Sequence, residues 1–213
     1  MNLTGYLFDA ANWTWSSPLL IALGVHALAT LALLLAGGLL GLGLGCLFGV
    51  FRGSRPVLRV LSWLGAAVPV LGLLGIGVII FGAGLPVLGA CLLLLITLAV
   101  AGTTAGAFRA GDQHVIESGR AMGLSRAGVF FGYRLPLLLP RVLHTLARVG
   151  AATVTMLAVA GVVGAPGLGE VIKVGFDAGY PQVFAGAVLL IALGWLFYLI
   201  FASLGWAARR RVA

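Results

Sequence analysis

Residues 87–107 read VLGACLLLLITLAVAGTTAGA, an apolar stretch without a charged residue. Its length matches the roughly 20 apolar residues that an α-helix needs to cross the hydrocarbon core of a bilayer. Similar stretches flank it, and together they predict five spans, at about residues 18–51, 57–81, 87–107, 137–163 and 183–207. The expected fold is an all-α integral membrane protein, with residues 1–213 forming a single transmembrane domain of five helices.

The composition supports a membrane location for the whole chain. Of its 213 residues, 62% are hydrophobic and only 8% are charged, and the mean hydropathy is +1.17. In an average soluble domain about a quarter of the residues are charged, so this chain cannot cover its surface in that way. Its 33 glycines suit helix packing in lipid, where small residues let backbones approach closely. We expect the glycine-rich stretch 37–49 to pack against a neighbouring helix or to bend.

The basic residues predict an orientation. They follow the first, third and fifth spans: Arg52, Arg55, Arg59, Arg109, Arg120, Arg126, Arg134, Arg209, Arg210 and Arg211. The opposite side holds Asp9, the uncharged turn 82–86, and a loop with Glu170, Lys173 and Asp177. Because short loops rich in Lys and Arg stay in the cytoplasm, we expect the N-terminus outside and the C-terminus inside. The net charge of +8 then reflects orientation and anionic lipid headgroups, and nucleic-acid binding is not expected.

The cytoplasmic loop, residues 108–136, is the most polar stretch between spans. Its pattern predicts two short helices at an angle to each other on the membrane face. Gly123 is expected to end the first helix in a left-handed cap, and Ser125 to cap the second. Pro136 is expected to end the second helix and to push Leu135 out of helical geometry. On periodicity alone, an interfacial helix tied to lipid headgroups explains this loop better than a docking element does.

The loop also carries a spaced set of residues: Glu117, Ser118, Gly119, Gly123, Tyr133, Leu135 and Pro136. Three residues separate Gly119 from Gly123, and nine separate Gly123 from Tyr133. This set resembles the EAA loop of ABC (ATP-binding cassette) importer permeases, whose pattern is Glu-Ala-Ala, three residues, Gly, nine residues, Ile, one residue, Leu-Pro. Ser118 and Gly119 replace the two alanines with small residues, and Tyr133 replaces isoleucine with another large side chain.

The resemblance implies a coupling helix that sits in a groove of a separate ATP-binding subunit. Glu117 would make the polar contact, while Ala121 and Met122 would fill the groove and Gly123 would make the sharp turn. The residues implied in coupling are Glu117, Ser118, Gly119, Ala121, Met122, Gly123, Leu124, Leu135 and Pro136. Taken alone, Glu117 is explained as a solvated helix residue paired with Arg120 or with water, an explanation that fits less well for a glutamate at the head of this pattern.

The resemblance further implies the partners and the location. They are a dimer of ABC ATPases that binds ATP and Mg, an extracytoplasmic substrate-binding protein, and the bacterial-type plasma membrane, which the chain crosses several times. Because five helices are too few to enclose a pathway alone, we also expect a second permease subunit, either identical or a homologue. The chain has no Gly-x-x-x-x-Gly-Lys-Ser/Thr loop, so neither ATP nor another cofactor is expected in it. His114 and His144 have no further ligands at metal spacing, so a metal is not expected either.

Two rival classes are disfavoured. An intramembrane enzyme would need a constellation such as His-Glu-x-x-His or Gly-x-Ser-x-Gly, and neither occurs. A stand-alone secondary transporter often has inverted repeats and midplane carboxylates, which five spans and the absence of a buried acid argue against.

Three further segments bear on the substrate: residues 68–74 (VPVLGLL), 104–112 (TAGAFRAGD) and 164–169 (GAPGLG). They resemble stretches of permeases for osmoprotectants such as glycine betaine, choline or carnitine. The glycine-rich third segment also occurs in methionine importer permeases, which are the alternative. The second-span segment favours an osmoprotectant.

Arg141 and Arg148 lie early in the fourth span and share a helix face, because they are seven residues apart. Arg141 can extend to the cytoplasmic surface, whereas Arg148 lies about 16 Å beyond Leu137 along the helix. Arg148 matches an arginine usual in the resembled family, which implies a pathway or gating role. The same role is implied for Pro69, Gly164, Gly167 and Gly169. Contact of Arg148 with headgroups or helix carbonyls is as compatible with the sequence.

Overall fold

The computed structural model describes residues 4–50, 56, 60, 69–82, 84–110, 117–119 and 121–210, and every regular element within these ranges is a helix. The long helices are α2 (Pro18–Val50), α5 (Leu85–Ala110), α8 (Leu135–Ala160) and α10 (Tyr180–Arg210). The short ones are α1 (Gly5–Phe8), η1 (Ala10–Trp13), α4 (Val70–Phe81), α7 (Arg126–Val129), the π-helical turn η3 (Phe130–Arg134), η4 (Gly161–Val163) and α9 (Leu168–Ala178).

Four helical stretches in the described part of the chain are long and apolar enough to cross a membrane. They are Ala10–Val50, Leu85–Phe108, Arg126–Val163 and Tyr180–Arg210, and they correspond to the predicted first, third, fourth and fifth spans, of which only residue 51 lies outside the described ranges. The predicted second span, 57–81, overlaps α4, an apolar helix of 12 residues. Residues 57–59 and 61–68 lie outside the described ranges, so the count of five crossings stays a prediction.

A stripe of glycines joins α2 to α5. From Gly37 to Gly49 every fourth residue is glycine, and each faces one residue of α5 at the same spacing. The pairs are Gly37–Ile96, Gly41–Val100, Gly45–Thr104 and Gly49–Phe108. A Cβ atom added to Gly41 would lie 2.6 Å from the Cβ of Val100, so a larger residue would force the backbones apart. The prediction that the stretch 37–49 packs against a neighbouring helix is confirmed.

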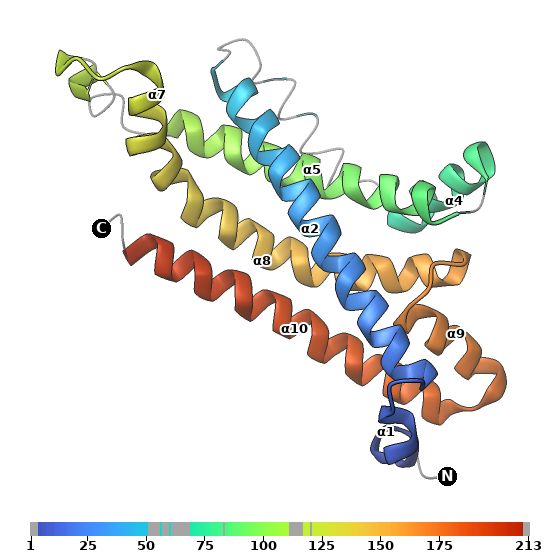
Figure 1. Ribbon diagram of the computed structural model, residues 1–213. Helices are drawn as coiled ribbons and strands as arrows, with labels where there is room; N and C mark the ends of the chain where they lie inside the picture. The colour runs from blue at the N-terminus through green and yellow to red at the C-terminus, as the bar shows by residue number, and fades with distance from the viewer. Residues whose placement is uncertain are drawn as a thin grey trace.

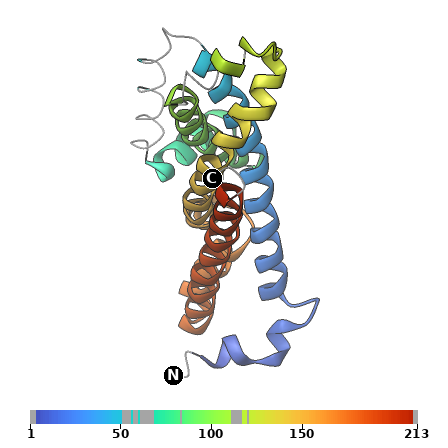
Figure 2. The ribbon, with the colours of Figure 1, turned by 90° about the vertical axis from the view of Figure 1, so that its left-hand side faces the viewer.

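Helix α8 lies at the centre of the bundle, in contact with α2, α5 and α10. It runs alongside α10 in the opposite direction, and α2 crosses both (Figures 1 and 2). Gly150 of α8 faces Leu34 of α2 and Phe197 of α10, and Gly205 of α10 faces His144. The buried core around these contacts includes Leu34, Val100, Leu146, Val154, Leu193 and Phe197.

Apart from Arg141 and Arg148 along α8 and the acidic Glu117 near α7, the charges of the described residues separate to the two ends of the bundle. The end with α7 and the C-terminus carries Arg126, Arg134, Arg209 and Arg210 (Figure 1). The end with α1 and α9 carries Asp9, Glu170, Lys173 and Asp177. The described basic residues that follow the third and fifth spans thus lie at one end, and the orientation across a membrane stays a prediction.

Helix α9 occupies a segment that the sequence suggested was a loop. It begins after Gly167 and ends at Ala178, and its inner face packs on α10. There Gly186 lies against Ile172, and Gly175 lies against Val183. The three charged residues that marked this segment as a loop fall on one amphipathic helix, which is too short to be read as a span.

Pro136 does not end a helix, so that prediction was wrong. Leu135 has helical dihedrals, φ −62° and ψ −46°, and Pro136 lies in the first turn of α8. The π-helical turn η3 directly precedes it and widens the hydrogen-bond spacing, which accommodates a residue without a backbone N–H. The helix therefore continues from Arg126 to Val163 instead of forming a separate second helix on the membrane face.

Candidate functional site

The predicted coupling segment contains a well-defined helix end at Gly123. The N–H of Met122 donates to the carbonyl of Ser118 at 3.0 Å, and the N–H of Leu124 donates to the carbonyl of Gly119 at 3.1 Å. Gly123 between them has φ +83°, the left-handed conformation that closes a Schellman-type cap. The prediction that Gly123 ends the first helix of the loop is confirmed.

A second cap follows immediately. The hydroxyl of Ser125 accepts a hydrogen bond from the N–H of Gly128 at 3.0 Å, as predicted, and starts α7. Leu124, between the two caps, packs back on Gly119, where an added Cβ would lie 3.5 Å from both Leu124 and Val129. Gly119 is therefore buried beneath the turn, and the segment is a compact corner.

The corner directs most of the predicted coupling residues outward. The exposed ones are Glu117, Ser118, Ala121, Met122, Gly123 and Leu124, while Leu135 and Pro136 are half-buried at the start of α8. Met122 has 69% of its surface exposed. The neighbouring Ala121 and Leu124 are exposed as well, so the outer side of the corner is partly apolar.

The predicted coupling segment continues into the π-helical turn that ends at Arg134, which contacts α5. Its guanidinium lies 4.3 Å from the centroid of the Phe108 ring at the end of α5. Phe108 in turn lies against Gly49 at the end of α2, where an added Cβ would come within 2.7 Å of the ring. The Arg134–Phe108 and Phe108–Gly49 contacts thus connect the start of α8 to the ends of α5 and α2.

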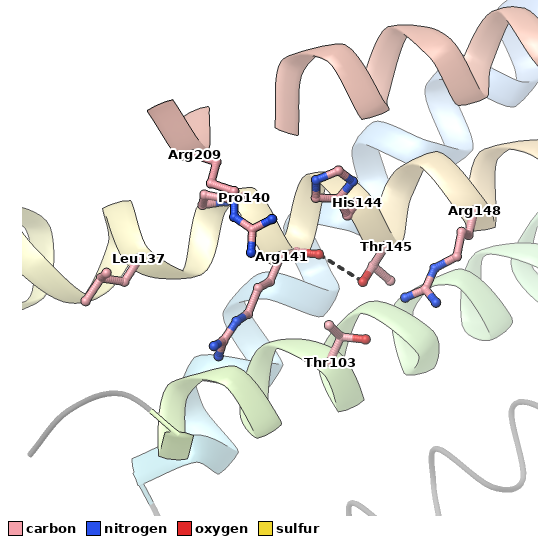
Figure 3. Close-up of a pocket in the computed structure, with 8 residues that line it drawn as sticks. All are labelled: Thr103, Leu137, Pro140, Arg141, His144, Thr145, Arg148 and Arg209. Atoms are coloured by element: carbon pink, nitrogen blue, oxygen red, sulfur yellow. Dashed lines mark hydrogen bonds between the residues drawn. The ribbon is translucent and has the colours of Figure 1, made fainter. Parts of the chain in front are cut away.

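A second polar feature is a basic recess of about 450 Å³ beside α8. It is lined by Thr103, Leu137, Pro140, Arg141, His144, Thr145, Arg148 and Arg209 (Figure 3). Arg141 and Arg148 extend from α8 toward α5, and Arg209 reaches Pro140 from the end of α10. The hydroxyl of Thr145 donates to the carbonyl of Arg141 at 3.0 Å, and that of Thr103 to the carbonyl of Ala99 at 3.2 Å. The guanidinium groups are thus the main donors that face the recess.

The other predicted pathway residues lie elsewhere. Gly164, with φ +101°, ends η4, and Gly167, with φ +129°, precedes α9. Gly169 is pressed against the backbone of Ala158. These glycines form the tight connection from α8 to α9, about 18 Å or more along α8 from Arg148. The structure does not bring Arg148 into one site with them.

Pro69 stands apart from both features. It is exposed and occupies the position before the first residue of α4. Its role in the pathway stays a prediction.

The sequence missed two features of these sites. His26 is fully buried, with its Nε2 atom 3.1 Å from the carbonyl oxygen of Val154, and Gly167 packs against its ring. Arg209, interpreted only as an orientation signal, lines the basic recess. Neither has a local sequence signal, because both contacts join helices far apart along the chain.

We compared the sequence with known protein families. Residues 37–212 match the family described as binding-protein-dependent transport system inner membrane component. The chain belongs to this family. It is thus a permease subunit of an ABC importer and not a catalytic subunit.

Solved structures support the fold of this permease. A chain of the MetNI methionine ABC transporter in inward-facing conformations, from the CY5 native crystal form, superposes with a TM-score of 0.77. The two are 21% identical over 94% of this chain and 98% of that one. A second MetNI chain, from the CY5 SeMet soak crystal form, gives a TM-score of 0.71 and 22% identity over 90% and 96% of the two chains. No curated protein matches the sequence.

Proposed function

We propose that this permease imports a small amino-acid-like solute of the methionine type, as one of two permease subunits driven by a separate dimer of ATPases. The likeness to the methionine transporter MetNI along nearly the whole chain supports methionine over the osmoprotectants that the sequence favoured. Glycine betaine or carnitine remains the second candidate, because residues 68–74 resemble the osmoprotectant permeases.

The proposal that an ATPase docks on this chain is supported mainly by the corner at Gly123. It holds Glu117, Ala121 and Met122 at the surface, with an acid for polar contact and an apolar side chain for a groove. An interfacial helix would instead turn its apolar side chains toward lipid along one continuous face. The two caps at Gly123 and Ser125 break that continuity, which supports docking to a protein.

A second permease subunit is expected beside α8. The exposed residues of α8 include Arg141, His144, Arg148 and Thr155. They form a polar face on a helix of membrane-spanning length. Polar and charged side chains at membrane depth face other helices or water and not lipid. This face is therefore proposed to line a pathway that two permease chains enclose.

The proposed orientation places the α7 end in the cytoplasm of a bacterial-type cell. Arg126, Arg134 and Arg209 lie at that end, and short basic loops stay cytoplasmic. The α1 and α9 end would then meet an extracytoplasmic substrate-binding protein.

Co-purification with an ABC ATPase tests the docking. We expect a tagged permease to retain the ATPase. Glu117→Arg should lower its recovery by about tenfold or more, since the reversal leaves the polar partner of Glu117 without its counterpart in a desolvated contact. Glu170→Arg is the matched control, because Glu170 is also exposed but lies on α9 at the other end of the bundle. Equal recovery with both reversals would show that Glu117 does not contact the ATPase.

A further inference from the structure

We propose that Arg148 binds the carboxylate of the transported solute, with Arg141 and Arg209 drawing the anion into the basic recess. This inference rests on the proposed function, because it assumes that the exposed face of α8 lines the pathway. It restricts the solute to compounds that carry a carboxylate group.

The position of Arg148 along α8 is the first observation. The helix runs from Leu135 to Ala160, so Arg148 lies about 20 Å from its start and about 18 Å from its end. It is nevertheless exposed. A guanidinium at the middle of a membrane helix is too costly to face lipid, so it faces water or another chain.

The second observation concerns the missing counter-ion. In the described part of the structure, no carboxylate forms an ion pair with Arg148, and its guanidinium makes no hydrogen bond there. The chain has only five acidic residues: Asp9, Asp112, Glu117, Glu170 and Asp177. None of these falls within the stretches that form α2, α4, α5, α8 or α10. An identical second permease subunit would therefore also lack a carboxylate at the depth of Arg148.

The third observation is the shape and chemistry of the recess. Figure 3 shows the side chains of Arg141 and Arg148 on the same side of α8, with Thr103 of α5 opposite them. A volume of about 450 Å³ is in the range of sites for small molecules. A guanidinium offers two parallel N–H donors to a carboxylate, which gives both affinity and orientation. The recess thus provides one cationic anchor and room for the rest of a small solute.

An anionic lipid would offer a similar oxyanion, but the depth of Arg148 argues against it. Lipid phosphates lie at the edge of a hydrocarbon core about 30 Å thick, roughly 15 Å from its middle. A solute that moves through the pathway passes this depth, whereas a headgroup does not reach it. The zwitterions methionine, glycine betaine and carnitine fit such a site, and choline, which has no carboxylate, does not.

Paired ligands test the inference. The full chain in lipid nanodiscs would be titrated with radiolabelled glycine betaine and choline, and with L-methionine and L-methioninol. Within each pair the carboxylate is replaced by a hydroxymethyl group. We expect at least one carboxylate ligand to bind about tenfold or more tightly than its alcohol partner, the size of a charged hydrogen-bond contribution.

Three variants assign that preference to Arg148. Arg148→Gln should remove it, and Arg148→Lys should keep part of it because the charge remains. Arg210→Gln is the control and should leave it unchanged, since the guanidinium of Arg210 lies over the Trp206 ring, 3.4 Å from its centroid, and does not line the recess. The inference is overturned if no pair shows the preference, or if Arg148→Gln preserves it. Native mass spectrometry that finds an Arg148-dependent phospholipid in place of the solute would overturn it too.

Failure of this inference can be told apart from failure of the proposed function. The same Arg148→Gln sample would be assayed for ATPase co-purification, which also checks that the variant folds. If the ATPase binds and no carboxylate preference exists, only the role of Arg148 falls. If the natural chain does not retain the ATPase, the docking proposal falls instead.

Discussion

The guanidinium of Arg134 lies 4.3 Å from the centroid of the Phe108 ring, and this pair joins the segment proposed for coupling to α5. Arg134 closes the π-helical turn that leads into α8, while Phe108 is buried against Gly49 of α2. One contact thus links the three helices α2, α5 and α8 at the end where an ATPase is proposed to dock.

Phe108→Leu should weaken this link without leaving a large cavity. The substitution removes the cation–π attraction, which contributes about 1 kcal/mol at a partly buried site, and keeps most of the apolar volume. We expect a lower Tm by about 2–4 °C and weaker coupling between solute and ATP hydrolysis, measured as solute-stimulated ATPase activity of the assembled transporter. Phe131→Leu is the control, because Phe131 is 65% exposed and its ring contact is with Phe130, whereas the ring under the Arg134 guanidinium is that of Phe108. An equal loss in both variants would argue against a specific role for the Arg134–Phe108 pair.

Gly41→Ala should destabilise the packing of the α2 glycine stripe against α5. Its new Cβ would meet the Cβ of Val100 at 2.6 Å and the carbonyl oxygen of Thr97 at 2.8 Å, and overpacking of this kind costs about 1–3 kcal/mol. Thermal unfolding in detergent should therefore show a Tm several degrees lower than that of the natural chain. Gly43→Ala is matched in chemistry and helix, but an added Cβ there meets nothing within 4 Å. That variant should be neutral or slightly stabilising because alanine favours helix. The packing argument fails if the two variants behave alike.

Much of the fold was predictable because its signals are local. The apolar runs gave the four described spans to within a few residues at most boundaries, since span length is set by bilayer thickness. The caps at Gly123 and Ser125 were also predictable, because each depends on the chemistry of a single residue and its immediate neighbours.

The features that were missed depend on context beyond a short window. Pro136 was expected to stop a helix, but the π-helical turn before it, which has no known sequence signature here, lets the helix continue. Arg209 joins the basic recess only because α10 returns antiparallel to α8. His26 is buried because α8 and α9 close over it, and its position in α2 alone does not reveal that.

Gly123→Ala should weaken ATPase docking more than it affects the fold. Gly123 has φ +83° and no atom within 4 Å of an added Cβ, so the penalty is conformational, about 1–2 kcal/mol for a left-handed alanine. The corner that holds Glu117 and Met122 outward would be populated less often. Recovery of the ATPase in co-purification should fall about five- to thirtyfold while the Tm changes little. Gly132→Ala serves as the control, because Gly132 lies in a right-handed helical turn and also has open space around it. Undiminished recovery with Gly123→Ala would mean that the bound corner does not use the left-handed turn.

Gly169→Ala should disrupt the connection from α8 to α9. The new methyl group would collide with the backbone of Ala158, and Gly161 already lies so close that its own added Cβ would come within 2.6 Å of the Gly169 carbonyl carbon. Both obstacles are backbone, which cannot move aside as a side-chain end can, so α9 must shift or detach from α8. We expect a loss of about 2–3 kcal/mol or more, seen as a lower Tm and as faster hydrogen exchange of α9 amides. A Cβ added at Gly194 in α10 would meet nothing within 4 Å. Gly194→Ala should therefore leave the Tm and the hydrogen exchange of α9 unchanged. Because the glycines at 164–169 lie at the end of the bundle opposite α7 and the corner at Gly123, Gly169→Ala should leave ATPase co-purification intact. A loss of co-purification in a variant that still folds would show that the two ends of the bundle are coupled.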